Sequence, residues 1–147
     1  MSTRARLLVV DDQPANGKLL GDILSVHGYD VRIAYSGHEG LEAVGKYAPD
    51  VVLLDVMMPD LDGYEVCRRI RSNPVTELLP VVMITALDPV EERVKGINAG
   101  ADDFLTRPIN RHELLARVRS LLRIGELHRL VEQQAAQLSD WNHMLES

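Results

Sequence analysis

The segment Val51-Val52-Leu53-Leu54-Asp55 decides the fold, because it is a short apolar run that ends in a carboxylate. Two further runs have the same form. Leu7-Leu8-Val9-Val10 ends in Asp11-Asp12, and Val81-Val82-Met83-Ile84 ends in Thr85. Each run is rich in valine and carries no polar side chain on either face. This pattern is typical of a central strand in a parallel sheet that is buried on both faces.

Working outward from these runs, two weaker strands fit at Asp30–Ala34 and at about Asp102–Thr106. Five segments with helical periodicity follow the strands. They run from Pro14 to a stop at Gly28, from about Gly37 to Tyr47, from about Gly63 to Ser72, from about Pro89 to Asn98 with a stop at Gly100, and onward from Asn110. Pro14 suits a first helical turn, and glycine suits a helix end.

The expected inward faces of these helices follow from the same spacing. We expect buried stripes at Leu19, Leu20, Ile23 and Leu24, at Leu41 and Val44, and at Leu114, Leu115, Val118, Leu121 and Leu122. Regular alternation of strands and helices with short loops predicts an α/β fold, a (βα)5 doubly wound parallel sheet between two layers of helices. Ligands bind such sheets at the carboxyl ends of the strands. The aspartates and Thr85 lie at that edge.

Composition excludes several classes of protein. The chain has 147 residues, enough for one domain and an extra helix, and its net charge of −6 gives no case for direct nucleic acid binding. No apolar stretch approaches the roughly 18 residues that span a membrane. Cys67 is the sole cysteine, so we expect a reducing, cytoplasmic setting. The five histidines lack the spacing of metal ligands.

The last 25 residues, 123–147, have a heptad pattern. With Ile124 as position a, the seam is Ile124, Leu127, Val131, Gln134, Leu138, Trp141 and Leu145. Six of these seven residues are apolar, which favours a parallel two-stranded coiled coil. Because the seam differs from the core-facing stripe of the fifth helix, we expect one long helix that packs on the sheet and then leaves the domain. The alternative is a helix that folds back on its own domain.

Three carboxylates, Asp11, Asp12 and Asp55, should converge at the strand ends. Two such charges about 4 Å apart repel by roughly 1 kcal/mol in water and about 4 kcal/mol at a partly buried site. A cation would relieve this repulsion, and ligation by oxygen alone favours Mg²⁺ over zinc. The simpler interpretation is that Asp12 caps the first helix and Asp55 ends its strand in a turn. These structural roles account less readily for the occurrence of Asp12 and Asp55 together, beside a basic residue and a hydroxyl at neighbouring strand ends.

Four motifs identify a family. DDQP (11–14), LLDVMMPDLDG (53–63), ITA (84–86) and GADDFLTRP (100–108) resemble, in order and spacing, the receiver domain of two-component response regulators over about residues 5–122. The resemblance implies strand order 2-1-3-4-5. It also implies a receiver domain at 1–122, a helical coiled-coil linker at 123–147, and an output domain outside this sequence.

The resemblance implies a role for each site residue. Asp55 matches the phosphoacceptor, which takes a phosphoryl group from a sensor histidine kinase or a phosphotransfer protein. Asp11, Asp12 and Asp55 match the Mg²⁺ ligands, together with the backbone carbonyl of Met57. Thr85 matches the switch hydroxyl and Phe104 the aromatic switch. From the residues alone, Thr85 is an ordinary strand residue and Phe104 an ordinary core aromatic.

Arg107 departs from the family pattern, which has lysine before the proline. Arginine keeps the charge but is longer and planar, so it is not an equivalent replacement. We expect phosphorylation to survive with an altered rate. The rival hypothesis is a receiver-like module that is not phosphorylated and only dimerises or docks. The resemblance also implies a cis Arg107-Pro108 bond.

Met57 and Leu87 lie two residues after Asp55 and Thr85, where the family tunes the access of hydrolytic water. Both are apolar and cannot orient a water molecule, so we expect slow self-dephosphorylation. A haloacid-dehalogenase-type phosphatase would need an aspartate at Met57. An EF-hand starting at Met58 fails at its first position and at its twelfth, Arg69; Asp60 and Asp62 are better explained as turn and helix-cap residues.

The receiver itself is not expected to be an enzyme beyond self-phosphorylation and self-dephosphorylation. Phosphorylation would switch the face formed by the fourth helix, fifth strand and fifth helix, and so control a parallel homodimer. Similar helical linkers lead to nucleotide cyclases, diguanylate cyclases or histidine kinases. The segment Leu138–Glu146 most resembles a linker before a class III nucleotide cyclase.

Overall fold

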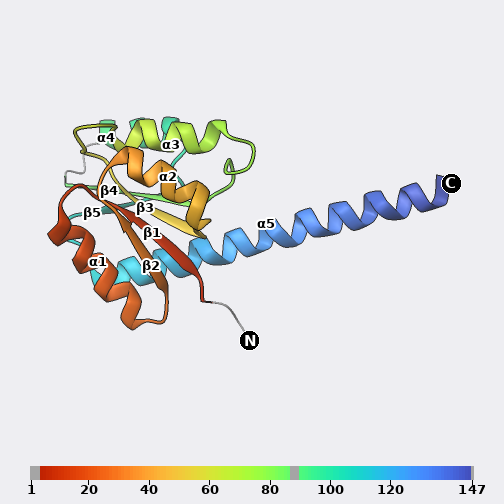
Figure 1. Cartoon of the computed structure of the whole chain (residues 1–147), viewed down its shortest axis with the longest axis horizontal. Coiled ribbons are helices and arrows are strands. Elements are labelled where there is room, and N and C mark those ends of the chain that lie inside the picture. Colours follow the sequence, from red (N-terminus) through yellow and green to blue (C-terminus); the bar gives the residue numbers. More distant parts are fainter. Residues whose placement is uncertain (1–3, 87–89, 147) are drawn as a thin grey trace.

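Five strands and five helices alternate along the chain in the computed structural model, which describes residues 4–86 and 90–146 (Figure 1). The elements are β1 (Arg6–Val10), α1 (Pro14–Val26), β2 (Asp30–Ala34), α2 (Gly37–Tyr47), β3 (Val51–Asp55), α3 (Gly63–Ser72), β4 (Val81–Thr85), α4 (Val90–Ala99), β5 (Asp103–Thr106) and α5 (Arg111–Glu146). The predicted strand–helix alternation is therefore confirmed. The predicted start of the fourth helix at Pro89 lies outside the described residues.

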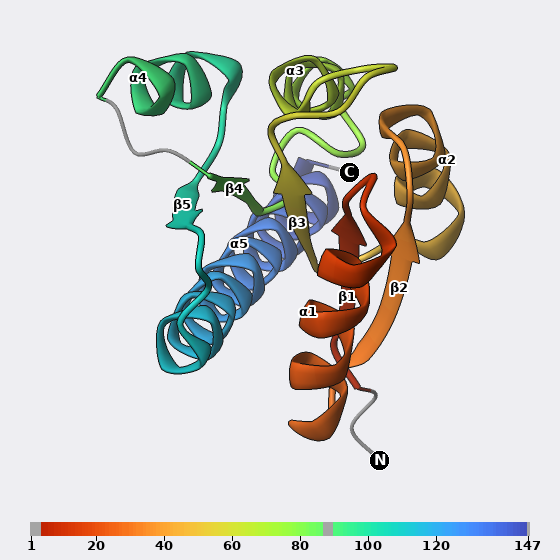
Figure 2. The ribbon, with the colours of Figure 1, turned by 90° about the vertical axis from the view of Figure 1, so that its left-hand side faces the viewer.

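The five strands form one parallel sheet in the order β2-β1-β3-β4-β5, as the resemblance implied. Helices α1 and α5 cover one face, and α2, α3 and α4 cover the other (Figure 2). Alternate residues of the central strands point into the two layers. Leu7 and Val9 pack with α1 and α5, whereas Leu8 and Val10 pack with α2 and α3. Burial on both faces explains why these strands are continuously apolar.

One residue of the predicted core is misplaced. Leu19 was expected in the buried stripe of α1, but its side chain is 56% exposed. The buried residues of α1 are Gly17, Leu20, Gly21 and Leu24. The two glycines allow α1 to lie close to Ile33 of β2. Since consecutive helical residues are about 100° apart, this contact face turns Leu19 outward.

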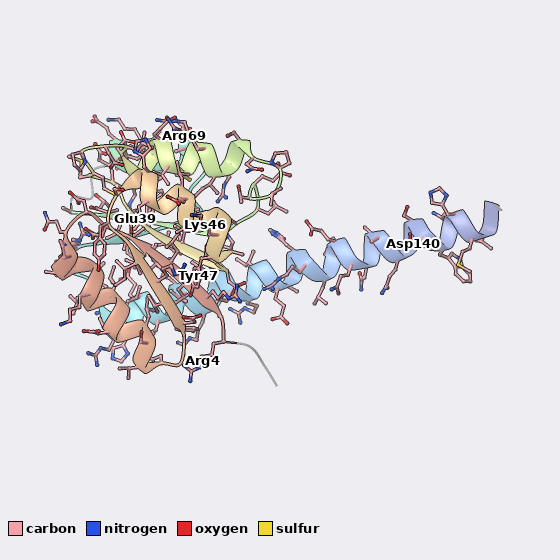
Figure 3. All side chains as sticks on the ribbon, viewed as in Figure 1. Arg4, Glu39, Lys46, Tyr47, Arg69 and Asp140 are labelled. Atoms are coloured by element: carbon pink, nitrogen blue, oxygen red, sulfur yellow. The ribbon has the colours of Figure 1, made fainter. Side chains whose placement is uncertain are left out.

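Helix α5 has 36 residues and two parts. Its first part is buried against the sheet through Leu114, Leu115, Val118 and Leu121, with Leu122 partly buried. The second part projects from the domain, and Asp140 lies far from the sheet (Figures 1 and 3). The prediction of one long helix that leaves the domain is confirmed, and the fold-back alternative is wrong. Among the described helices, none is both long and apolar enough to cross a membrane.

Candidate functional site

The strand register brings the acidic residues together. Val10 of β1 pairs with Leu54 of β3, so Asp11 and Asp55 leave neighbouring strands at the same level. Both are buried, with relative exposures of 1% and 4%, while Asp12 is partly exposed. One carboxylate oxygen from each of the three aspartates can be chosen so that all lie within 4.8 Å of one another. The predicted convergence of the three carboxylates is thus present.

Arg107 lies across this acidic cluster. Its Nη2 donates to Asp11 Oδ2 at 2.5 Å, and its Nη1 donates to Asp55 Oδ1 at 3.2 Å. The main-chain N–H of Arg107 donates to the Thr85 carbonyl at 2.9 Å, which fixes the arginine to the end of β4. The Arg107-Pro108 bond is cis, as the resemblance implied. One guanidinium group therefore bridges two carboxylates that belong to different strands.

Burial controls the protonation of these carboxylates. Desolvation, reinforced by the negative charge of Asp11, raises the pKa of Asp55 to about 6, and the charge of Arg107 opposes this rise. The pKa of Asp11 is also raised, mainly by burial, against the hydrogen bond from the Gln13 N–H and the charge of Arg107. Both pKa values are raised because burial replaces part of the water that would stabilise the ionised form.

The residues present fit a divalent cation. Three carboxylates and one guanidinium leave two negative charges when all the groups are ionised, and a divalent cation would balance them. The side-chain ligands available are oxygen atoms alone, which suits Mg²⁺. Asp11, Asp12 and Asp55 are the side chains that would hold the ion. No soft or imidazole ligand lies in this cluster of described residues.

Thr85 ends β4 at the sheet edge that carries the cluster, and Phe104 lies on the neighbouring strand β5. Asp55 pairs with Ile84, so Thr85 follows at the same sheet edge, and it is 8% exposed. Phe104 is partly buried, and its ring packs over Gly96 of α4. A Cβ atom at position 96 would overlap that ring. Gly96 is a packing partner that the sequence patterns did not identify.

The loop after β3 is held close to Asp55. The Met57 main-chain N–H interacts with the Asp55 carboxylate and lowers its pKa, while the Met57 side chain is 74% exposed. Gly63 allows the loop to close, because a Cβ atom there would meet the main chain of Asp55 and Val56. Leu87, the second residue expected to tune water access, lies outside the described residues.

Asp60 and Asp62 were expected to be turn and helix-cap residues; Asp62 caps the helix that follows it, whereas Asp60 also binds the start of α2. Asp62 accepts from Glu65 N at 2.9 Å and caps α3. Asp60 instead accepts from the Gly37 and His38 main-chain N–H groups of α2, at 3.1 and 2.9 Å. These hydrogen bonds hold the pKa of Asp60 well below its usual range. A contact across more than 20 residues has no signal in local sequence, so only the fold reveals it.

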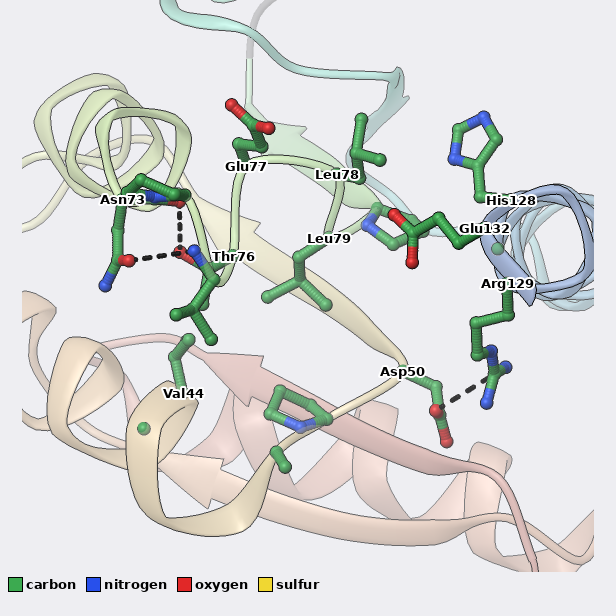
Figure 4. A pocket seen from close by; sticks show the side chains of 17 residues that line it. Val44, Asp50, Asn73, Thr76, Glu77, Leu78, Leu79, His128, Arg129 and Glu132 are labelled. Carbon is green, nitrogen blue, oxygen red and sulfur yellow. Dashed lines mark hydrogen bonds and ion pairs between the residues drawn. The ribbon is translucent and has the colours of Figure 1, made fainter. Parts of the chain in front are cut away.

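A separate hollow of about 460 Å³ lies at the opposite edge of the sheet, between α2, the segment 73–80 and α5 (Figure 4). It is lined largely by apolar residues such as Val44, Leu78 and Leu79. At its margin Arg129 of α5 faces Asp50, with 3.9 Å between Nη2 and Oδ1. The lining contains none of the predicted site residues, so the acidic cluster remains the candidate functional site.

A doubly wound sheet with an acidic cluster at the carboxyl ends of β1 and β3 defines a class of signalling domain. The model of the response regulator receiver domain matches residues 7–119, and the chain belongs to this family. It is the receiver domain of a two-component response regulator.

Its relatives include two curated response regulators. It is 47% identical over 135 residues to response regulator MprA of Mycobacterium bovis, covering 92% of this chain and 58% of that protein. It is 50% identical over 119 residues to response regulator PleD of Caulobacter vibrioides, covering 81% of this chain and 26% of that protein. The chain thus spans about half or less of these relatives' lengths.

A solved structure confirms the fold. The crystal structure of a putative response regulator from Chloroflexus aurantiacus aligns with a TM-score of 0.80 and 39% identity, covering 82% of this chain and 99% of that one.

Proposed function

We propose that this receiver domain accepts a phosphoryl group on Asp55 from a sensor histidine kinase or a phosphotransfer protein, with Mg²⁺ at the site. The observation that carries the proposal is the convergence of Asp11, Asp12 and Asp55, two of which, Asp11 and Asp55, are bonded by the guanidinium of Arg107. Mg²⁺, when bound, would neutralise charge on the transferred phosphoryl oxygens. The backbone carbonyl of Met57 is proposed as a further ligand.

The residues of the chain have distinct roles in this proposal. A carboxylate oxygen of Asp55 attacks phosphorus, a P–O bond forms, and the P–N bond to the donor histidine breaks with its electron pair returning to the imidazole. Arg107 contacts the new phosphoryl group. The Thr85 hydroxyl then bonds a phosphoryl oxygen, and Phe104 reorients as Thr85 moves, which alters the face formed by α4, β5 and α5. The aspartyl phosphate persists because Met57 cannot orient a hydrolytic water.

Phosphorylation can be tested without knowing the donor. The protein is incubated with Mg²⁺ and acetyl phosphate, and the intact mass is measured; beryllofluoride binding is followed by NMR in parallel. We expect a phosphoryl adduct in the wild type and in Asp140→Asn, a control on the projecting helix, but none in Asp55→Asn. An adduct lost within seconds in the presence of Mg²⁺ would contradict the slow self-dephosphorylation.

The second candidate function is a module that is not phosphorylated and only dimerises or docks. Arg107 favours it, because the guanidinium already occupies both buried carboxylates. Absence of an adduct and of any beryllofluoride effect in the wild type would select this function.

We also propose that residues 1–122 act as the receiver and residues 123–147 as a coiled-coil linker to a second copy. The seam residues are exposed, from 42% at Ile124 to 68% at Leu145. Gly125 and Arg129, which line the hollow beside the domain, lie on the other side of the helix from Leu127 and Val131. With 3.6 residues per turn, the seam is therefore roughly opposite the domain-facing stripe. A parallel partner helix can lie there without meeting its neighbour's receiver.

The remaining parts of the proposal concern the whole regulator. Dimer geometry along the seam would transmit the phosphorylation state to an output domain, for which a nucleotide cyclase is our candidate. The receiver would not catalyse reactions beyond its own phosphorylation and dephosphorylation. A cytoplasmic location would give it access to a kinase and to Mg²⁺. The net charge of −6 gives no electrostatic case for direct binding to nucleic acid, and we propose no membrane contact for this part of the regulator.

A further inference from the structure

Arg107 holds two buried carboxylates with a single planar group. Its two terminal nitrogens bond different residues, Nη2 to Asp11 and Nη1 to Asp55. The carboxylates have side-chain exposures of 1% and 5%, so solvent ions screen these contacts weakly. The guanidinium of Arg107 is thus a positive charge already present at the site.

Both oxygens of Asp11 are engaged. Oδ1 accepts from the Gln13 main-chain N–H at 2.9 Å, and Oδ2 accepts from Arg107. The Gln13 N–H belongs to the residue before α1 and is fixed by the backbone. Arg107 is a long side chain with 24% exposure and can move. Oδ2 keeps a second lone pair, but a metal ion bound there would lie beside the positively charged Arg107 Nη2, so their repulsion favours loosening of this contact.

We propose that Arg107 competes with Mg²⁺ for Asp11, and thereby sets how tightly this site binds the metal. The inference rests on the proposed function, since it concerns the same metal site. With an internal competitor, the apparent affinity equals the intrinsic affinity multiplied by the fraction of molecules in which Asp11 is free. Arg107 thus lowers the metal affinity of the resting protein, before any phosphoryl group arrives.

The planar shape of arginine strengthens this competition. Its two terminal nitrogens are fixed in one plane, so tilting Nη2 away from Asp11 also disturbs the bond from Nη1 to Asp55. The ammonium group of lysine is a compact point charge with freely rotating donors. A lysine at position 107 would keep its bond to Asp55 while releasing Asp11. Replacement by lysine therefore removes the fork and keeps the charge.

The experiment measures Mg²⁺ binding, without phosphorylation, by isothermal titration calorimetry. The proteins are the wild type, Arg107→Lys, Arg107→Met and a control, Lys46→Met, which removes an exposed cation of α2. We expect the dissociation constant to fall at least about threefold in Arg107→Lys and about tenfold in Arg107→Met, because a freed Asp11 raises the competent fraction. Lys46→Met should match the wild type.

A second measurement uses the wild type and so does not depend on the folding of a variant. The Arg107 side-chain nitrogen signals are followed by NMR during a Mg²⁺ titration. We expect them to shift along the same binding curve as the calorimetric heat.

The possible results distinguish failure of the Arg107 competition from failure of the proposed magnesium-dependent function. Unshifted Arg107 signals during Mg²⁺ binding would overturn the competition. A change of less than twofold in Arg107→Lys would do the same, because any effect in Arg107→Met would then come from charge alone. If no protein binds Mg²⁺ at all, the proposed magnesium-dependent function fails, and the competition fails with it.

Discussion

Asp55 is a residue at which the proposed function opposes stability. Its carboxylate is 4% exposed and lies beside Asp11, and its pKa rises from 3.8 to about 6. In the unfolded chain the group ionises near its ordinary value. The folded protein therefore binds the proton more tightly than the unfolded chain does. The resulting stabilisation is complete below about pH 4 and is lost as the pH rises through about 6.

Asp55→Asn should accordingly stabilise the metal-free protein. A pKa difference of about two units corresponds to at most about 3 kcal/mol at pH 7, and this figure already includes the opposing effect of Arg107. Urea unfolding in EDTA at pH 7 and at pH 4.5 measures it. The gain should shrink at the lower pH. Equal or lower stability of Asp55→Asn at pH 7 would show that the site does not strain the carboxylate.

Replacement by alanine should have opposite effects on stability at two helical glycines, Gly45 and Gly96. Alanine favours a helix by about 1 kcal/mol over glycine. At Gly45 of α2 a Cβ atom meets nothing within 4 Å, so Gly45→Ala should stabilise by about 0.5–1 kcal/mol. At Gly96 the same atom overlaps the Phe104 ring, so Gly96→Ala should destabilise by about 1–3 kcal/mol despite its propensity. Thermal unfolding of both variants tests the opposite signs; a stabilised Gly96→Ala would mean that the ring moves freely.

At the scale of elements, Arg71 of α3 ties together three segments. Its Nε, Nη1 and Nη2 donate to the Gly100 carbonyl, the Leu79 carbonyl and Asp102 Oδ2, at 2.8, 2.6 and 2.7 Å. Asp102 Oδ2 also accepts from the Val81 main-chain N–H at 2.8 Å. The network joins α3 to the start of β4 and to the turn before β5.

Removing Arg71 should lower the free energy of unfolding much more than removing its exposed neighbour Arg69. Arg71→Met leaves two partly buried carbonyls and Asp102 without their donor, and we expect a loss of about 2–4 kcal/mol in the free energy of unfolding. Arg69→Met, the control, breaks one exposed contact to Glu65 at 3.2 Å and should cost less than about 0.5 kcal/mol. Denaturant titration compares them. Similar losses for the two variants would assign the Arg71 network no special role.

Local patterns predicted most elements because each central strand is buried on both faces and each helix ends at a recognisable residue. Helices α2 and α3 have the predicted bounds, Gly37–Tyr47 and Gly63–Ser72. The predicted burial of Leu19 was wrong because glycines, rather than large apolar side chains, form the contact face of α1. The convergence of Asp11 and Asp55 was predictable from strand ends. The forked contact of Arg107 and the caps from Asp60 were not, because they join residues far apart in sequence.

At the scale of the whole molecule, α5 joins the receiver to an exposed apolar seam. Leu127 and Val131 are 55% and 63% exposed, although burial of each such side chain is worth roughly 1.5–3 kcal/mol. Gln134 at a core position weakens the seam. These opposing effects predict a reversible homodimer whose population depends on protein concentration.

Val131→Asp should abolish this dimer, since a carboxylate at an a position would meet its symmetric copy in an apolar interface. Ala136→Asp introduces the same charge at an f position on the outer side of the helix and should leave association unchanged. Sedimentation velocity over a range of concentrations distinguishes the two. Equal dimerisation of the wild type and Val131→Asp would place any dimer contact elsewhere on the receiver. A wild type that stays monomeric at all concentrations would mean that the seam needs the phosphorylated receiver, or the rest of the regulator, to associate.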